Sequence, residues 1–441
     1  MLYAPRVSSD RFRTKLDRAD PLGVEGRVVA LTGLSVRVVV PLVRVGELVC
    51  IERPEPYGPL HAEVVGFDDA TAVVMPLGDA AGIGLDDPVR PERVRGSLLC
   101  GRGVLGRVLD GLGRPADGKG PIEGETVRWD VDRAPPDPMT RGRVSRPLAL
   151  GIRVLDGLLT VGEGQRVGLF AGSGVGKSTL MGQIARQCAA DVVVIALVGE
   201  RGREVREFLD DSLGVESLAR ACVVVATSDA PALVRLRSAF VATAVAEYFR
   251  DQGARVLLVM DSVSRVARAQ REVGLAAGEP PARRGYPPSV FALLPRLLER
   301  TGPGSRGSIT AFYTVLVEGG DMDEPIADEV RGILDGHVVL DRSIGARNRW
   351  PAVDVLHSLS RVMDGIVSPA HRDASARLRQ LLEAYESKRD LIALGAYQRG
   401  TDRATDEALA RIDRIEAFLR QDRKDPSPFD TTLVRLAEAV R

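Results

Sequence analysis

The stretch Gly168-Leu-Phe-Ala-Gly-Ser-Gly-Val-Gly-Lys-Ser-Thr-Leu180 decides the fold of the central part of the chain. Its apolar start is typical of a buried strand, its glycines of a tight turn, and its end of the first turn of a helix. Small residues in such a turn let backbone N–H groups point inward around a polyphosphate at the helix N-terminus. The stretch therefore predicts a strand, a phosphate-binding loop and a helix in that order.

The loop carries the groups that a nucleotide site uses. In this motif the lysine reaches the β- and γ-phosphates and the following hydroxyl holds Mg²⁺, and these roles fall to Lys177 and Ser178. Ala171 stands where the motif has its first glycine, and alanine is also small. A chance glycine turn is the alternative, but strand, loop and helix follow in the required order. We expect ATP and Mg²⁺ as ligands, with nucleotide contacts from Gly172, Ser173, Gly174, Val175, Gly176, Lys177, Ser178 and Thr179.

Strands and helices alternate from Leu150 to about Asp341, which predicts an α/β domain with a mainly parallel sheet. We place this nucleotide-binding domain at residues 151–365. Its expected strands are 166–170, 192–198, 222–226, 255–261, 308–316 and 337–340, and its clearest helices are 177–187 and 233–250.

Two of these expected strands end in a carboxylate, Glu200 and Asp261. In an open parallel sheet the ligand crevice lies outside the carboxyl ends of the strands, so both acids should approach the phosphate loop. We expect Glu200 to polarise the attacking water and Asp261 to join Ser178 in the Mg²⁺ shell. Either acid alone could equally be the cap of a following helix.

The regions before and after this domain differ from it in composition and hydrophobic pattern. Residues 25–95 contain closely spaced short β-rich runs, which predict a small β-barrel, and residues 96–150 are rich in Gly and Pro and resemble a linker. Residues 366–441 have helical spacing and predict a helical domain, with Thr401 as an expected N-cap. Residues 1–24 form a separate polar N-terminal segment.

The composition indicates the cell compartment of the protein and the partners that it lacks. The 60 basic and 60 acidic side chains cancel, so the chain has no overall charge that would attract nucleic acid or an anionic membrane. The four cysteines show no C-x-x-C spacing and no histidines cluster beside them, which argues for a reducing compartment and against a zinc site or disulfides. The polar start lacks the apolar core of a signal peptide, and no segment has about 20 apolar residues in a row, so we expect a cytoplasmic protein.

Several motifs together resemble the hexameric ATPases of type III secretion systems, which are related to the catalytic subunits of rotary ATP synthases. The resemblance runs from about residue 20 to the end of the chain. It rests on residues 171–180, Gly199-Glu-Arg-Gly-Arg-Glu-Val205, the GRVLDGLGRP run from Gly106, Trp350-Pro-Ala-Val-Asp354 and Ser358-Leu-Ser-Arg361. Residues 268–271, 278–289 and 317–322 look closer to secretion ATPases than to the synthase.

The resemblance implies a RecA-like core and further site residues. Glu200 would be the catalytic carboxylate, Arg201 a neighbour in the same site, and Arg361 an arginine finger reaching the γ-phosphate of the adjacent subunit. Trp350 stands where the family has an aromatic residue against the adenine, although it could instead pack at a domain junction. Lys177 completes the catalytic set.

The resemblance also implies partners and a location. The chain would form a homohexamer at the inner face of the bacterial inner membrane, peripheral to it. There it would meet stator or regulator proteins, a central stalk, the export gate and chaperone–substrate complexes, and no specific nucleic acid.

Three alternatives stay open at the level of sequence. The flagellar export ATPase shares every catalytic residue, although residues 225–235 look more like the injection-system branch. A synthase catalytic subunit has a dense acidic stretch in its helical domain, whereas the predicted helical domain here contains both acidic and basic residues. A ring-shaped RNA translocase would need a basic groove with stacking aromatics in the first domain, where residues 25–95 offer only Tyr57 and Phe67.

Overall fold

The computed structural model describes residues 25–172 and 174–441. The chain divides into two compact units. Of the described residues, one unit comprises 25–96 together with Ala276–Gly278, and the other comprises Ser97–Leu275 and Glu279–Arg441.

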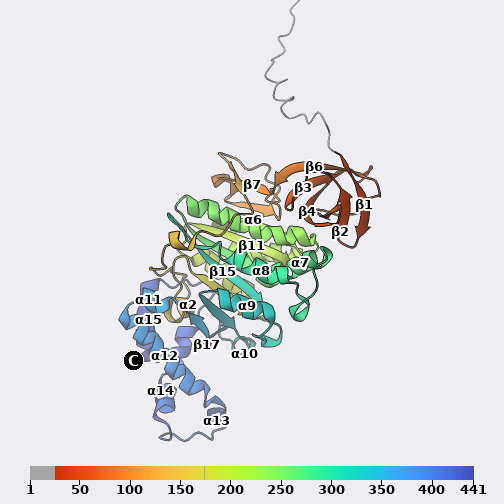
Figure 1. Cartoon of the computed structure of the whole chain (residues 1–441). Coiled ribbons are helices and arrows are strands. Elements are labelled where there is room, and N and C mark those ends of the chain that lie inside the picture. Colours follow the sequence, from red (N-terminus) through yellow and green to blue (C-terminus); the bar gives the residue numbers. More distant parts are fainter. Residues whose placement is uncertain (1–24, 173) are drawn as a thin grey trace, which may run out of the picture. The chain divides into compact units, whose positions relative to one another are not determined.

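The first unit contains a closed antiparallel barrel with the strand order β1-β2-β5-β4-β3-β6 (Figure 1). Alternate side chains point into the barrel, so Val36, Val38, Val49 and Ile51 are fully buried. The strands are β1 (Gly26–Thr32), β2 (Ser35–Val39), β3 (Glu47–Ile51), β4 (Leu60–Asp68), β5 (Thr71–Pro76) and β6 (Pro88–Arg95). The predicted small β-barrel is confirmed, and β6 closes it by pairing with β1 and β3.

The second unit is built on a sheet with the strand order β17-β16-β10-β15-β13-β11-β12-β8. The pairs from β16 to β8 are parallel, while β17 runs antiparallel to β16 and short β14 runs antiparallel to β15. The strands are β8 (Arg107–Asp110), β10 (Arg166–Ala171), β11 (Val192–Glu200), β12 (Ala221–Thr227), β13 (Arg255–Asp261), β14 (Gly302–Pro303), β15 (Ser308–Leu316), β16 (Gly336–Leu340) and β17 (Val353–Ser360). A separate ribbon pairs β7 (Ser97–Cys100) with β9 (Val127–Asp130). The predicted α/β core with a mainly parallel sheet is confirmed.

Helices cover both faces of this sheet, which is why β11 is buried along its whole length. Helix α6 packs on β11, β12 and β13 (Figure 1), while α3 contributes to the large hydrophobic core formed with the other face and the C-terminal helices. The helices are α2 (Arg153–Leu158), α3 (Lys177–Gln187), α4 (Gly202–Glu207), α5 (Val215–Leu218), α6 (Ala232–Asp251), α7 (Val263–Ala276), α8 (Pro288–Leu298), α9 (Pro325–Ile333), α10 (Arg342–Ala346), α11 (Met363–Ile366), α12 (Pro369–Glu386), α13 (Arg389–Ala393), α14 (Arg403–Leu419) and α15 (Phe429–Val440).

The Gly/Pro-rich segment expected to be a linker contributes β8 to the edge of the central sheet. Arg107 on β8 holds its own following turn through two hydrogen bonds to Asp117, at 2.8 and 2.9 Å. These bonds and two backbone N–H donors lower the pKa of Asp117 well below its usual value. Local polar bonds thus fold a segment that has too few apolar residues to look like a strand.

The C-terminal residues form the predicted helical region, in which α12, α14 and α15 pack on one another and on α2. The predicted cap of α14 is wrong by one residue. Asp402, not Thr401, is the N-cap, and its carboxylate accepts a hydrogen bond from the backbone N–H of Ala404. Thr401 instead donates its hydroxyl proton to the carbonyl of Gln398 in the preceding turn.

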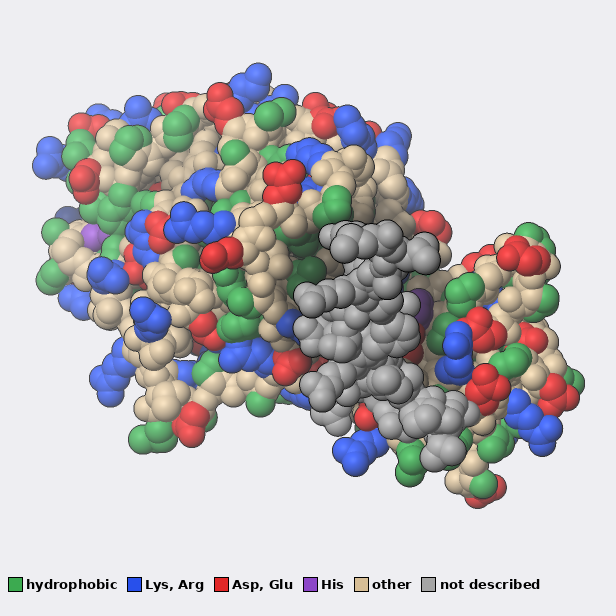
Figure 2. All heavy atoms as spheres, turned by 90° about the horizontal axis from the view of Figure 1, so that it is seen from above, with side chains coloured by type: hydrophobic (Ala, Val, Ile, Leu, Met, Phe, Trp, Pro, Cys, Tyr) green, Lys and Arg blue, Asp and Glu red, His purple; other side chains and the backbone are tan. Residues whose placement is uncertain are grey.

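Among the described residues, every helix is too short or too polar to span a lipid bilayer. On the face seen in Figure 2, basic and acidic side chains of the described residues are interspersed.

A fully buried ion pair provides a test of the core of the second unit. Arg300 donates to both carboxylate oxygens of Glu247 at 2.9 and 2.7 Å and to the carbonyl of Val131, and neither side chain of the pair is more than 1% exposed. Glu247→Ala leaves the guanidinium buried without its counter-charge, so we expect a loss of about 3–5 kcal/mol. Thermal unfolding should show a Tm several degrees lower.

The exposed pair Arg203–Glu207 on α4 is the matched control. Glu207→Ala should leave Tm almost unchanged, because exposed ion pairs contribute little. Equal shifts for the two variants would contradict the importance assigned to the buried pair.

Candidate active site

The loop between β10 and α3 has the backbone shape of a phosphate cradle. Gly174 and Gly176 have φ of 75° and 84°, in the left-handed region that favours glycine, and Gly176 is the N-cap of α3. A Cβ on Gly176 would also lie 2.7 Å from a ring carbon of Trp350. The positive φ and the nearby indole ring both favour glycine at Gly176. Without a side chain there, the backbone N–H groups at the helix N-terminus stay open to an anion. Ser173, a predicted nucleotide contact, lies outside the described residues.

Three charged side chains converge beside this loop because their strands end at the same edge of the sheet. Strand β13 pairs with β11 and β15, and β15 pairs with β10, all in parallel. Lys177 Nζ contacts Asp261 Oδ1 and lies 3.9 Å from Glu200 Oε1. The structure therefore brings Lys177, Glu200 and Asp261 together, as the strand-end rule predicts.

Glu200 is held partly protonated near neutral pH by its surroundings. Burial raises its pKa to about 7, helped by a hydrogen bond with the carboxyl of Glu204 and by the charge of Asp261, and opposed by the cations Lys177 and Arg265. Its Oε2 is 2.9 Å from the Arg265 guanidinium. Its Oε1 is buried without a hydrogen-bond partner. An unpartnered carboxylate oxygen beside a phosphate loop is suited to accept a proton or a hydrogen bond from water.

Asp261 is oriented by a side chain from the neighbouring strand. The Thr314 hydroxyl on β15 donates to Asp261 Oδ1 at 2.7 Å, and the carboxylate is only 2% exposed. Ser178 and Thr179 are exposed in the first turn of α3. One carboxylate and one hydroxyl fit Mg²⁺, which binds few protein oxygens and keeps phosphate and water oxygens for its other positions.

Trp350 lines a cavity of about 580 Å³ next to the phosphate loop. Its side chain is 41% exposed, and it lies against Gly176. The cavity is also lined by Gly174, Thr179, Leu180, Gln183, Asn348, Pro351 and Arg420, Gln421, Asp422 and Arg423. A half-exposed indole face in an open cavity offers a stacking surface for a nucleotide base.

The two predicted arginines are both exposed, and only Arg201, which directly follows Glu200, is near this cluster. Arg201 is 76% exposed and contacts Glu204 at 3.3 Å. Arg361 is exposed and follows β17, and its backbone N–H donates to the carbonyl of Asp335, just before β16 begins. That places Arg361 at the amino end of the parallel strands, whereas the phosphate loop leaves their carboxyl end.

Three features of the site were not predicted from the sequence. Arg265 lies within α7 and Thr314 within an apolar strand, so neither stands at a strand end, the signal that identified Glu200. Residues 420–423 come from the helical region more than 240 positions after the loop and look like an ordinary charged turn. Their link to the site is tertiary: the backbone N–H of Gln421 donates to the carbonyl of Trp350 at 2.8 Å.

A parallel sheet with a phosphate loop and buried acids at its carboxyl edge defines a nucleotide-binding domain of the P-loop class. Residues 151–360 match the model of the ATP synthase alpha/beta family, nucleotide-binding domain, and residues 367–438 match that of the T3SS EscN ATPase C-terminal domain.

Similar proteins extend this match to nearly the whole chain. The type 3 secretion system ATPase of Xanthomonas euvesicatoria is 52% identical, covering 94% of each chain, and the flagellum-specific ATP synthase of Bacillus subtilis is 51% identical, covering 93% of this chain and 94% of that one. The assembled ATPase EscN of enteropathogenic E. coli, solved in complex with its central stalk EscO, superposes with a TM-score of 0.87 at 44% identity. That match covers 94% of this chain and all of EscN. The chain belongs to the type III secretion and flagellum-specific ATPases of the ATP synthase alpha/beta family.

The raised pKa of Glu200 predicts a pH dependence. The ionised carboxylate is the form that accepts a hydrogen bond from water, so kcat/KM for ATP should rise with pH through about 7 and then level off. Glu204→Ala removes a group that raises this pKa and should shift the midpoint to lower pH. Steady-state rates between pH 5.5 and 9 measure both. An unmoved midpoint in Glu204→Ala would mean that the titrating group is not Glu200.

Stacking on Trp350 predicts a fluorescence signal. The chain has two tryptophans, and Trp129 packs instead against Tyr248 and Arg133 in the same unit. ADP should quench the indole emission of wild type and of Trp129→Phe, but not that of Trp350→Phe. Trp350→Ala should weaken nucleotide binding about 3- to 10-fold, the effect of losing one aromatic contact. Unchanged affinity in Trp350→Ala would place the base elsewhere.

Proposed function

We propose that this protein is the ATP-hydrolysing, homohexameric motor of a type III protein secretion apparatus. It uses hydrolysis to dissociate chaperone–substrate complexes and to unfold substrates for export. Family membership supports the ATPase activity, and similarity to the secretion ATPases over more than 90% of the chain supports the setting.

The single observation that carries the proposal is the position of Arg361. It lies at one end of the parallel strands, while Lys177, Glu200 and Asp261 lie at the other. Strand β10 spans six residues between these two ends, which is about 17 Å at the usual rise per residue. Arg361 therefore serves as a finger only in the site of a neighbouring subunit, and the activity requires a ring.

Within one subunit the described groups divide the chemistry among them. Lys177 binds the phosphates, and Glu200 orients and polarises the attacking water through its unpartnered oxygen. Ser178 and Asp261 hold Mg²⁺, which neutralises charge on the phosphates when it is bound. Thr314 positions Asp261, and Arg265 positions Glu200. Arg201, exposed in the single chain, completes the site when the ring forms.

The proposal also includes the binding partners of the protein and its location in the cell. The similar EscN was solved with its central stalk EscO, so a stalk protein of this kind is the expected axial partner. Stator or regulator proteins, the export gate and chaperone–substrate complexes are the others. The motor works in the cytoplasm, peripheral to the inner face of the inner membrane.

The flagellar export ATPase is the second candidate, since the Bacillus subtilis flagellum-specific relative is as similar as the secretion relatives. The two functions share all the catalytic residues. Hook and filament genes beside this gene, or rescue of motility in a flagellar ATPase deletion, would favour the flagellar assignment.

A mixing experiment tests the site shared between subunits. Lys177→Ala keeps its finger but loses its phosphate grip, and Arg361→Ala keeps its phosphate grip but loses its finger. Each variant alone should lose on the order of 10³-fold in ATPase rate. Mixed before assembly, the two should recover a measurable fraction of the activity, because some interfaces then join an intact site to an intact finger.

Activity of Arg361→Ala near that of wild type would rule out the finger. A mixture that co-assembles but stays as inactive as its components would rule out a site completed in trans. Activity of Lys177→Ala at the wild-type rate would remove the ATPase assignment altogether.

A further inference from the structure

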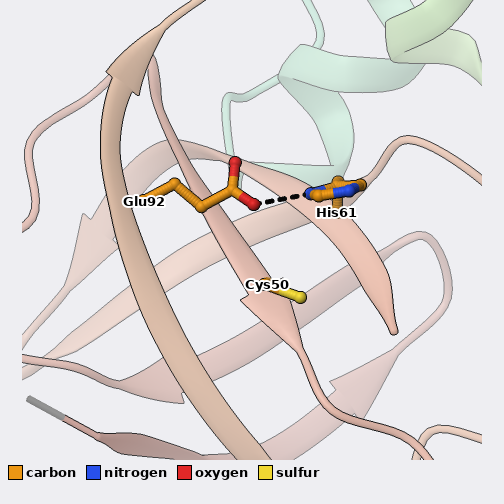
Figure 3. A group of neighbouring side chains, drawn as sticks. All are labelled: Cys50, His61 and Glu92. Carbon is orange, nitrogen blue, oxygen red and sulfur yellow. Dashed lines mark ion pairs between the residues drawn. The ribbon is translucent and has the colours of Figure 1, made fainter. Parts of the chain in front are cut away.

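Outside the nucleotide site, the barrel brings together three different metal-binding side chains, Cys50, His61 and Glu92 (Figure 3). They come from three adjacent strands, β3, β4 and β6, with β3 in the middle. The Cys50 thiol, a ring nitrogen of His61 and a carboxylate oxygen of Glu92 all lie within 4.8 Å of one another. This cluster is contained within the first unit.

Strand register explains why these residues meet. Cys50 lies directly opposite His61 on β4 and Arg90 on β6, so the side chains of this row share one face of the sheet. Glu92 is two residues beyond Arg90 and therefore points to the same side. The neighbours of Cys50 on β3, Val49 and Ile51, point into the barrel and are fully buried. The cluster thus occupies the outer face of the barrel.

The ligand atoms are near enough to one another to share a metal ion. Zn–S and Zn–N bonds of about 2.3 and 2.0–2.1 Å place neighbouring ligand atoms about 3.4–3.6 Å apart. His61 Nδ1 and Glu92 Oε1 are 2.7 Å apart, and all three ligand atoms lie within 4.8 Å. Binding a metal ion therefore requires His61 and Glu92 to move slightly apart, while no ligand atom has to move far.

The polar groups of the cluster are only partly satisfied without a metal ion. His61 Nδ1 is buried and has no hydrogen-bond partner, although it lies 2.7 Å from Glu92 Oε1 in an ion pair. The Cys50 thiol donates a hydrogen bond to Glu52 Oε1 at 3.5 Å, and Glu52 also pairs with Arg90. With Cys50 as thiolate and His61 neutral, the two carboxylates, Arg90 and the thiolate leave two negative charges, which a divalent cation balances.

We propose that Cys50, His61 and Glu92 bind one Zn²⁺ ion, with water as the fourth ligand. Thiolate and imidazole favour zinc over Mg²⁺ and Ca²⁺, which prefer oxygen ligands. The bound ion replaces the thiol proton, which passes to solvent. It ties β3, β4 and β6 together across the barrel and is independent of nucleotide binding. Sequence spacing argued against a zinc site, because the three ligands are separated by 11 and 31 positions and only the barrel register unites them.

Cobalt binding to the full-length protein tests the proposal, because a cobalt–thiolate bond produces a charge-transfer absorption band. The protein is stripped with a chelator, kept reduced and titrated with Co²⁺ in excess Mg²⁺ without nucleotide. Wild type should bind one equivalent with a thiolate band that Zn²⁺ abolishes. Cys50→Ser should lose the band, and His61→Ala and Glu92→Gln should weaken Zn²⁺ binding by at least about 10-fold. Zn²⁺ should also raise the Tm of wild type but not of Cys50→Ser.

Two variants are matched controls. His357→Ala removes a histidine that also pairs with a carboxylate, Asp354 at 2.8 Å, but in the other unit. Cys100→Ser removes another buried thiol, also in the other unit. Both should retain the band. The proposal is overturned if wild type shows no thiolate band, or if the band persists in Cys50→Ser. Should Cys50→Ser fail to fold, full Zn²⁺ affinity in His61→Ala, whose side chain is 43% exposed, overturns it equally.

Discussion

The nucleotide site depends on one cation placed between two buried carboxylates. Lys177 contacts Asp261 and lies within 4 Å of Glu200, in a place where an isolated charge would be expensive. Lys177 is therefore the principal positive charge on Asp261, while Glu200 also has Arg265. In the proposed mechanism, bound phosphates would draw Lys177 away from Asp261, and the Asp261 carboxylate would then be free to hold a metal ion.

The direction of the strands in the sheet is a second constraint, because it decides at which edge each site residue lies. Parallel strands place every loop that follows a strand at one edge, which gathers Lys177, Glu200 and Asp261. Because β17 runs antiparallel at the end of the sheet, the residue that follows it, Arg361, lies at the opposite edge. If Arg361 is the arginine finger that we propose, it therefore acts in the site of a neighbouring subunit and not in its own.

Much of the core could be predicted from the sequence because buried parallel strands are continuous apolar runs, and the acids at their ends are conspicuous. Strand β8 was missed because arginine and glycine surround it, and local ion pairs stabilise it instead of a long apolar run. Arg265 and Thr314 were missed because they reach the site only through contacts with residues distant in the sequence, Glu200 and Asp261. Asp402 was missed although aspartate is the better cap, because adjacent Thr and Asp can both cap a helix and the sequence alone left the start of α14 uncertain by one residue.

The central claim is that the active site is completed by a neighbouring subunit, and the dependence of activity on protein concentration tests it most directly. The ATPase rate per chain should rise steeply over the concentration range in which native mass spectrometry detects conversion of monomer to hexamer. A rate per chain that stays constant across that range, with monomers as active as rings, would contradict the account.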